Sequence, residues 1–165
     1  MILAPIPPNE DERLTALRQL LILDTPEEER FDRIVAFAAE EFDVPIAVVS
    51  IVDSNRTWFK ARFGIDLTES PRDISFCGHA IWHDEPFIVP DASLDLRFAD
   101  NPNVTGAPFV RFYAGACLKL PGGKNVGTLC LYDFKPREMD RIALVILGTL
   151  RDLVVEQLLN REAAA

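Results

Sequence analysis

The residues best suited to chemistry are concentrated in one stretch, "FCGHAIWHDEP" (residues 76–86), which holds both histidines of the chain and one of its three cysteines. His79 and His83 are four residues apart, so a helix would place them on one face. Cys77 stands two residues before His79 and would point elsewhere on that helix. Three kinds of site compete here: a metal centre, a reactive thiol and the wall of a binding pocket.

A metal centre has little support in the sequence. The zinc-peptidase motif HExxH needs a glutamate where this chain has Ala80. The three cysteines form no CxxC pair of the kind that holds structural zinc. The aspartates at 91, 95 and 100 lack the alternation of a calcium loop. We therefore expect no metal site.

A reactive thiol has a physical basis. Ser75 is placed to cap a helix that begins at Phe76, which puts Cys77 in the first turn, where backbone N–H groups stabilise a thiolate. Free cysteines are also common as small buried hydrophobes, and that interpretation stays open. The other two cysteines, Cys117 and Cys130, fall on adjacent predicted strands and are candidates for neighbours.

Composition restricts the compartment and the partners. The chain has 165 residues, 48% of them hydrophobic, which fits one globular domain, and no uncharged apolar run reaches the ~18 residues of a membrane span. The odd cysteine count and the lack of a secretion signal favour reduced thiols in the cytoplasm. A net charge of -9, without a basic cluster, opposes binding to nucleic acid. We predict a cytoplasmic protein that binds neither membrane nor nucleic acid.

The elements that must position these residues follow from periodicity and turn chemistry. Helices are predicted over residues 11–23, from a cap at Thr25 through Phe42, and over residues 137–161. Between them we predict strands, the clearest being an apolar central strand covered on both faces, and a hairpin closed by "PGGK". The predicted strands are "IAVVSIVD", "TWFKARFG", "PFIVPD", "YAGACLKL" and "NVGTLCLYD". This order indicates an α+β fold with an antiparallel sheet, in which residues 1–8 form a flexible arm, 9–161 a single domain and 162–165 a tail.

Two features indicate binding rather than catalysis. The long loops between residues 64 and 112 mix charged and aromatic residues, a pattern typical of a small-molecule pocket or of buried ion pairs that order the loops. No GxSxG, GxGxxG or phosphate-binding loop is present. The last helix is apolar on more than one stripe, so one face is free for a partner helix, and we expect a homodimer.

Four ordered blocks, "PRDISFCGHAI", "PFIVPDASLDLRFADNPNVTGAP", "RFYAGACL" and "GTLCLYDFKPRE", resemble GAF domains. The likeness runs from about residue 9 to about residue 158, and it is strongest to the sub-group found ahead of bacterial histidine kinases and diguanylate cyclases. It implies a central antiparallel sheet of about six strands, with the N- and C-terminal helices on one face and a loop-enclosed pocket on the other. It also implies a dimer of terminal helices, a downstream kinase or cyclase module, and a role in two-component or cyclic di-GMP signalling.

Specialised members of the family fit less well. Bilin-binding members attach their chromophore at a Cys-His pair, whereas Gly78 separates Cys77 from His79 here. Cys77 also resembles a cysteine of free methionine-(R)-sulfoxide reductase, but the matching catalytic thiol is expected in "RFADNPN" (residues 97–103), which has no cysteine. Family members usually carry proline at the position of Cys117. We therefore expect no enzymatic activity.

The resulting prediction is a sensory GAF domain that binds an unidentified small molecule and signals through its terminal helices. A thiol-based redox sensor or reductase-like enzyme, and a ligand-free dimerisation module, remain as alternatives. No cofactor is assigned. The predicted ligand-binding residues are Phe76, Cys77, His79, Asp91, Phe112 and Tyr113, and the predicted loop-ordering residues are Arg72 and Arg111.

Overall fold

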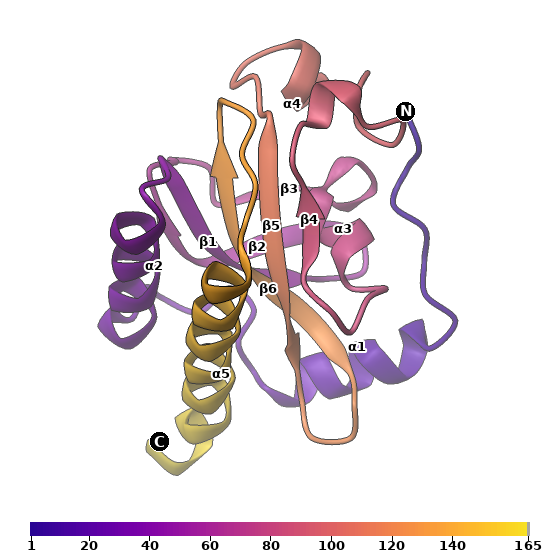
Figure 1. The fold of residues 1–165 in the computed structure, drawn as a ribbon. Coiled ribbons are helices and arrows are strands. Elements are labelled where there is room, and N and C mark those ends of the chain that lie inside the picture. Colours follow the sequence, from indigo (N-terminus) through magenta and orange to yellow (C-terminus); the bar gives the residue numbers. More distant parts are fainter. Residues whose placement is uncertain (165) are drawn as a thin grey trace.

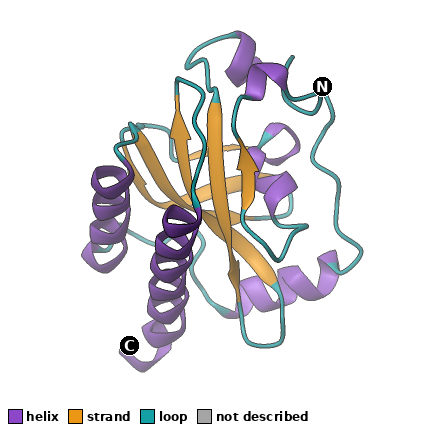
Figure 2. Ribbon diagram, viewed as in Figure 1, coloured by secondary structure: helices purple, strands orange, loops and turns teal. Residues whose placement is uncertain are grey.

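The computed structural model of the protein describes residues 1–164, with the backbone alone for residues 162–164. A six-stranded antiparallel sheet in the order β3-β2-β1-β6-β5-β4 forms its centre (Figures 1 and 2). The predicted α+β class and six-stranded sheet are confirmed. The strands are β1 (Ile46–Val52), β2 (Arg56–Phe63), β3 (Glu69–Pro71), β4 (Phe87–Val89), β5 (Phe112–Lys119) and β6 (Asn125–Asp133). The helices are α1 (Glu10–Gln19), α2 (Glu29–Phe42), α3 (Phe76–Ala80), α4 (Pro102–Thr105) and α5 (Arg141–Ala164), with 3-10 turns η1 (Arg72–Ile74) and η2 (Ala92–Leu94).

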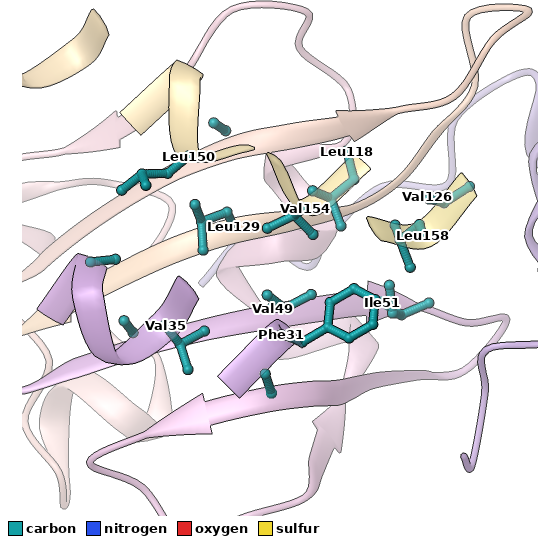
Figure 3. Close-up of a cluster of buried hydrophobic side chains, with 14 of the residues drawn as sticks. Phe31, Val35, Val49, Ile51, Leu118, Val126, Leu129, Leu150, Val154 and Leu158 are labelled. Carbon is teal, nitrogen blue, oxygen red and sulfur yellow. The ribbon is translucent and has the colours of Figure 1, made fainter. Parts of the chain in front are cut away.

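The helical side of the sheet holds the larger hydrophobic core. α1, α2 and α5 lie on this side, and Figure 3 shows Phe31 and Val35 of α2 and Val154 of α5 packed against the strands. Val49 and Leu129 supply the floor from β1 and β6, and both are fully buried. Burial of apolar surface between helix and sheet is the main stabilising term here.

The opposite side of the sheet carries a second core, covered by α3, η2, α4 and the loops between them (Figure 1). Side chains of β1 alternate between the two cores, with Val49 in one and Val48 in the other. All seven residues of β1 are buried, as the two-sided apolar pattern predicted. The sheet therefore separates a helix-covered face from a loop-covered face.

Three predicted boundaries differ from the structure. α1 ends at Gln19 because Leu21 adopts a left-handed conformation (φ 52°) that breaks the helix. Thr25 does not cap α2, since its hydroxyl donates to the Ile22 carbonyl (2.6 Å) and α2 begins only at Glu29. α5 begins later than predicted because the Asp140 carboxylate accepts a hydrogen bond from the Ala143 N–H (2.8 Å), as an N-cap does.

Both ends of the chain also depart from the sequence-based description. Residues 1–8, predicted as a flexible arm, lie along the loop-covered face, where the Ala4 N–H donates to the Asp73 carbonyl (2.8 Å) and the Trp82 indole N–H to the Pro5 carbonyl (2.7 Å). α5 extends to Ala164, so it overlaps the tail predicted at 162–165, and Ala165 lies outside the described residues. Within residues 1–164, no helix combines the length and apolar character needed to cross a membrane.

A charged cluster joins the start of α2 to the end of α5. The Glu28 carboxylate lies 2.6 Å from the buried Lys60 ammonium and 3.1 Å from the Arg161 guanidinium of α5. Partial burial raises the pKa of Glu28, but hydrogen bonds from Lys60, Arg30 and Arg161 outweigh it and lower the pKa to about 2. The carboxylate therefore stays charged, and ties α5 to α2, well into the acidic range.

The Glu28 cluster predicts an acid-sensitive contribution to stability. Because the pKa of Glu28 is lower in the folded than in the unfolded chain, its contribution is present above pH ~4.5 and is lost as the pH falls toward ~2. Denaturant unfolding at a series of pH values should show this loss in the wild type and a flatter acid limb in Glu28→Gln. Glu29→Gln is the matched control, since that carboxylate is 77% exposed in an ion pair with Arg33. Equal acid limbs in all three proteins would contradict the assignment.

The helix-side core predicts a large cost for truncating Leu129. This side chain is fully buried between β6 and the helices, and Leu129→Ala should lower the free energy of unfolding by about 2–5 kcal/mol through lost burial and the cavity left behind. Leu94→Ala, at a side chain that is 81% exposed, should change it by less than about 0.5 kcal/mol. Chemical denaturation measures both, and similar losses would contradict the described core.

Candidate functional site

The loop-covered face is built around a stack of aromatic rings beneath α3. The Phe76 ring stacks on Phe98 (centroids 4.2 Å apart) and on Tyr113 (5.2 Å), and meets the Tyr132 ring edge-on (5.9 Å). Gly115 makes this arrangement feasible, because a Cβ there would lie 2.3 Å from the Tyr113 hydroxyl. The "YAGA" sequence thus lets the tyrosine ring lie along β5, close to the strand.

The Cys77 sulfur lies at the centre of a buried polar cluster under the same helix. The hydroxyls of Ser50 (3.1 Å), Thr128 (3.3 Å) and Tyr113 (3.3 Å) lie within hydrogen-bond distance of it, and the Cys130 sulfur lies 3.8 Å away. Ser75 caps α3 by accepting from the Gly78 N–H (2.9 Å), which fixes the helix over this point. The thiol is completely buried, so the cluster forms a polar centre in an apolar layer.

The pKa values of the two neighbouring thiols, Cys77 and Cys130, shift in opposite directions. Burial raises the pKa of Cys77, but hydrogen bonds from Cys130 and the surrounding hydroxyls outweigh it and lower the pKa to about 6. Burial, together with the neighbouring Cys77, raises the pKa of Cys130 well above its usual value.

An apolar cavity of about 70 Å³ adjoins the aromatic stack and the thiol cluster. Phe76 and Tyr132 form part of its wall, and Val48, whose carbonyl accepts from the Cys130 thiol (3.5 Å), forms part of its floor. Its remaining wall comes from β1, β2 and the segments around β3, α3 and α4: Ile46, Phe59, Ile65, Leu67, Ser70, Ile74, Ser75, Asn103, Pro108 and Val110. This composition favours a small apolar ligand or group.

Of the six predicted ligand-binding residues, three lie in this region. Phe76 lines the cavity, while Cys77 and Tyr113 stand directly behind it in the polar cluster. Phe112 belongs instead to the helix-side core, which corrects its predicted place in the pocket. The reason is strand geometry: Phe112 and Tyr113 are consecutive in β5, so their side chains point to opposite faces.

Asp91 and His79 have structural contacts away from the cavity. Asp91 caps η2, and its carboxylate accepts from the Ser93 N–H (3.0 Å) and hydroxyl (2.6 Å). The His79 Nε2–H donates to the Ile2 carbonyl (3.0 Å), on the outer side of α3, and burial lowers the pKa of this imidazole. Gly78 lies under the same N-terminal segment, where a Cβ would come within 2.7 Å of the Ala4 side chain. Neither Asp91 nor His79 lines the cavity.

The two predicted loop-ordering arginines bind backbone carbonyls. Arg111 donates to the carbonyls of Val104 (2.9 Å) and Val110 (3.0 Å), at the end of the loop that bounds the cavity. Arg72 is buried, donates to the Asp53 carbonyl (3.0 Å) and pairs with Glu10 of α1 (2.7 Å). Arg72 thus joins the loop before α3 directly to the first helix.

Several residues of this site escaped the sequence-based prediction. Ser50 and Thr128 are hydrogen-bonded to each other (2.8 Å) as well as to Cys77. The sequence did contain a sign of this cluster: Ser50 and Thr128 each place a hydroxyl in the middle of a largely apolar central strand, β1 and β6. Cys130 was expected near Cys117, but its partner across the hairpin is Gly115, and the Cys117 thiol donates to the Ala80 carbonyl (3.1 Å) instead.

Among the described side chains, those of residues 1–161, no three His, Cys, Asp or Glu are grouped so that they could hold an ion.

Together, the six-stranded sheet, its terminal helices on one face and the loop-enclosed cavity on the other define the class of protein. The chain belongs to the GAF domain family, which its sequence matches over residues 26–158. It is also 45% identical over 137 residues to Cyclic di-GMP phosphodiesterase PA2567 of Pseudomonas aeruginosa. That alignment covers 83% of this chain and 23% of the relative, so the chain spans about a quarter of the relative's length.

Two solved structures share the fold at low sequence identity. The GAF domain of an Acinetobacter phosphoenolpyruvate-protein phosphotransferase has a TM-score of 0.66 and 18% identity, over 93% of this chain and 96% of that one. Free methionine-R-sulfoxide reductase from Neisseria meningitidis, solved in complex with its substrate, has a TM-score of 0.67 and 15% identity, over 100% of this chain and 99% of that one. These likenesses show a common fold.

The Arg72–Glu10 pair predicts a large stability effect. Arg72→Ala would leave Glu10 with a single cationic partner, Arg13, and free the loop carbonyls, so we expect a loss of about 3–5 kcal/mol in the free energy of unfolding. Arg33→Ala removes an arginine that is 75% exposed and paired with Glu29, and should cost at most about 1 kcal/mol. Urea denaturation compares the two variants, and a small loss for Arg72→Ala would contradict its structural role.

Proposed function

We propose that this GAF domain is a non-enzymatic sensor that binds a small, largely apolar molecule in the cavity beside Phe76 and Tyr132. The observation that carries the proposal is the cavity itself, which lies on the sheet face opposite the terminal helices. Its wall comes from several separate loops, so an occupant would change how those loops pack. Arg72 then provides a direct mechanical link from the loop before α3 to α1.

The output is proposed to pass through the terminal helices of a dimer. α5 presents exposed apolar side chains along its outer face, with Ile142 72%, Val145 64% and Leu153 42% exposed. Their spacing of three and eight residues places them on one stripe, which a second copy of the helix would cover. A ligand that binds one helix arrangement better than another would shift the population between them.

The signalling context is proposed from the relative in Pseudomonas aeruginosa. That protein is named as a cyclic di-GMP phosphodiesterase, and this chain matches less than a quarter of it. We propose that the present domain regulates an output module of cyclic di-GMP or two-component signalling, with which it acts in the cytoplasm.

Native mass spectrometry of the freshly purified chain tests the cavity. We expect an additional mass that disappears on denaturation, and its loss in Val110→Phe, which fills the cavity from its wall. Leu94→Phe is the control, because it adds the same ring at an exposed site away from the cavity. A wild type without bound mass, or equal occupancy in both variants, would contradict the proposed ligand site.

The dimer is tested by the mass of the particle in solution. Light scattering after size exclusion should give a dimer for the wild type and a monomer for Val145→Glu, since burying an unpaired carboxylate in a helix interface is unfavourable. Leu94→Glu, an equivalent change at an exposed apolar residue of η2, should stay dimeric. A monomeric wild type would refute transmission by helix pairing.

A further inference from the structure

The two buried cysteines behind the cavity are close enough to react with each other. Cys77 comes from α3 and Cys130 from β6, and their sulfurs are 3.8 Å apart. A disulfide bond is about 2.05 Å long, so the sulfurs need to approach by roughly 1.8 Å. A change of side-chain rotamer with a small shift of the five-residue helix α3 can supply that distance.

We propose that Cys77 and Cys130 form an oxidisable pair, which a hydroperoxide converts into an intramolecular disulfide between α3 and the centre of the sheet. This activity is separate from the proposed ligand sensing and does not require it. It concerns a fully buried pair of thiols that the sensing role leaves unused.

The surroundings assign different roles to the two sulfurs. The Tyr113 hydroxyl and one of the two linked hydroxyls of Ser50 and Thr128 donate to the Cys77 sulfur at a time, which stabilises the thiolate, the form of a cysteine that attacks peroxides. The Cys130 thiol lies 3.5 Å from the Val48 carbonyl and 3.8 Å from the Cys77 sulfur, and burial raises its pKa, so it keeps its proton. Cys77 is therefore the attacking residue and Cys130 the resolving one.

The oxidant is expected to approach this pair through the cavity, and neither sulfur itself lines the cavity wall. Tyr132 lines the cavity and its hydroxyl lies 3.7 Å from the Cys77 sulfur, while Val48 lines it next to Cys130. Because the wall is mainly aliphatic and aromatic, an alkyl hydroperoxide should enter more readily than hydrogen peroxide. A small alkyl group suits the volume of about 70 Å³.

The reaction balances without any further reactant. The Cys77 sulfur attacks the terminal peroxide oxygen, the O–O bond breaks, and the thiol proton passes to the leaving alkoxide, giving an alcohol and a sulfenic acid. The Cys130 sulfur then attacks the Cys77 sulfur, the S–O bond breaks, and hydroxide leaves as water with the Cys130 proton. Two thiols lose two electrons and two protons in total, and the hydroperoxide is reduced to alcohol and water.

Cys117 provides an internal control. It is buried, with 2% of its surface exposed against 0% for each thiol of the pair, and it lines a separate open pocket with Lys119 and Arg151. Its thiol donates to the Ala80 carbonyl, and within residues 1–164 no sulfur contact joins it to Cys77 or Cys130. Burial raises the pKa of Cys117 to about 12, which suppresses its reactivity. Burial alone therefore predicts three inert thiols, whereas the proposal predicts that two of them react together.

The experiment treats the full chain with tert-butyl hydroperoxide, blocks free thiols in denaturant and maps the digested peptides by mass spectrometry. We expect a cross-linked peptide pair containing Cys77 and Cys130, which dithiothreitol separates, in the wild type and in Cys117→Ser. We expect no such pair in Cys77→Ser or Cys130→Ser. Circular dichroism checks that each variant is folded, and the wild-type map tests the proposal even if a variant is not.

Three results would overturn the proposal. They are a wild type with no cross-link at any dose, a disulfide that joins two chains, and oxidation of Cys117 at the same rate as Cys77. The route of entry has its own test, in which tert-butyl hydroperoxide should act at least several-fold faster than hydrogen peroxide. The reverse order would overturn access through the apolar cavity.

Discussion

Two-sided burial of the central strands is the constraint on which the rest of the structure depends. β1, β5 and β6 lie inside the sheet and are buried along nearly their whole length, so each face needs its own cover. Long helices cover one face, because their apolar stripes pack efficiently on a sheet. Short helices and loops cover the other, and such a cover of separate segments leaves room for a cavity. The division between a helix-covered and a loop-covered face follows directly.

The buried polar side chains under the loop-covered face form hydrogen bonds with one another. A buried hydroxyl without a partner is costly, and Ser50 and Thr128 avoid that cost by bonding to each other and to the Cys77 sulfur. The same contacts make Cys77 unlike an ordinary buried cysteine. In the proposed disulfide reaction, the contacts that satisfy these buried hydroxyls are also the ones that favour Cys77 as the attacking thiol.

One ion pair connects the two faces of the sheet, and another joins two helices on the helix-covered face. Arg72 joins the loop before α3 to Glu10 of α1, and Glu28 joins the start of α2 to Arg161 near the end of α5. The first pair is largely buried, whereas the Arg161 and Glu28 side chains of the second are 17% and 25% exposed, so the geometry of the first pair is the more demanding. In the proposed sensor, a change in the loops would reach α1 through the Arg72–Glu10 pair. The Glu28–Arg161 pair would hold α5 against the start of α2.

The sequence by itself determined the fold class, five of the six strands, the capped helix at Phe76 and the family, because these depend on local periodicity, turn residues and ordered motifs. It also predicted Phe76, Cys77 and Tyr113 as ligand-binding residues. Only the tertiary structure decided that Phe112 faces the helices, that Cys130 lies beside Cys77 rather than Cys117, and that residues 1–8 pack against α3. These contacts join residues far apart in the chain, and they depend on strand register and on how α3 packs on the sheet. Local sequence patterns do not specify such contacts.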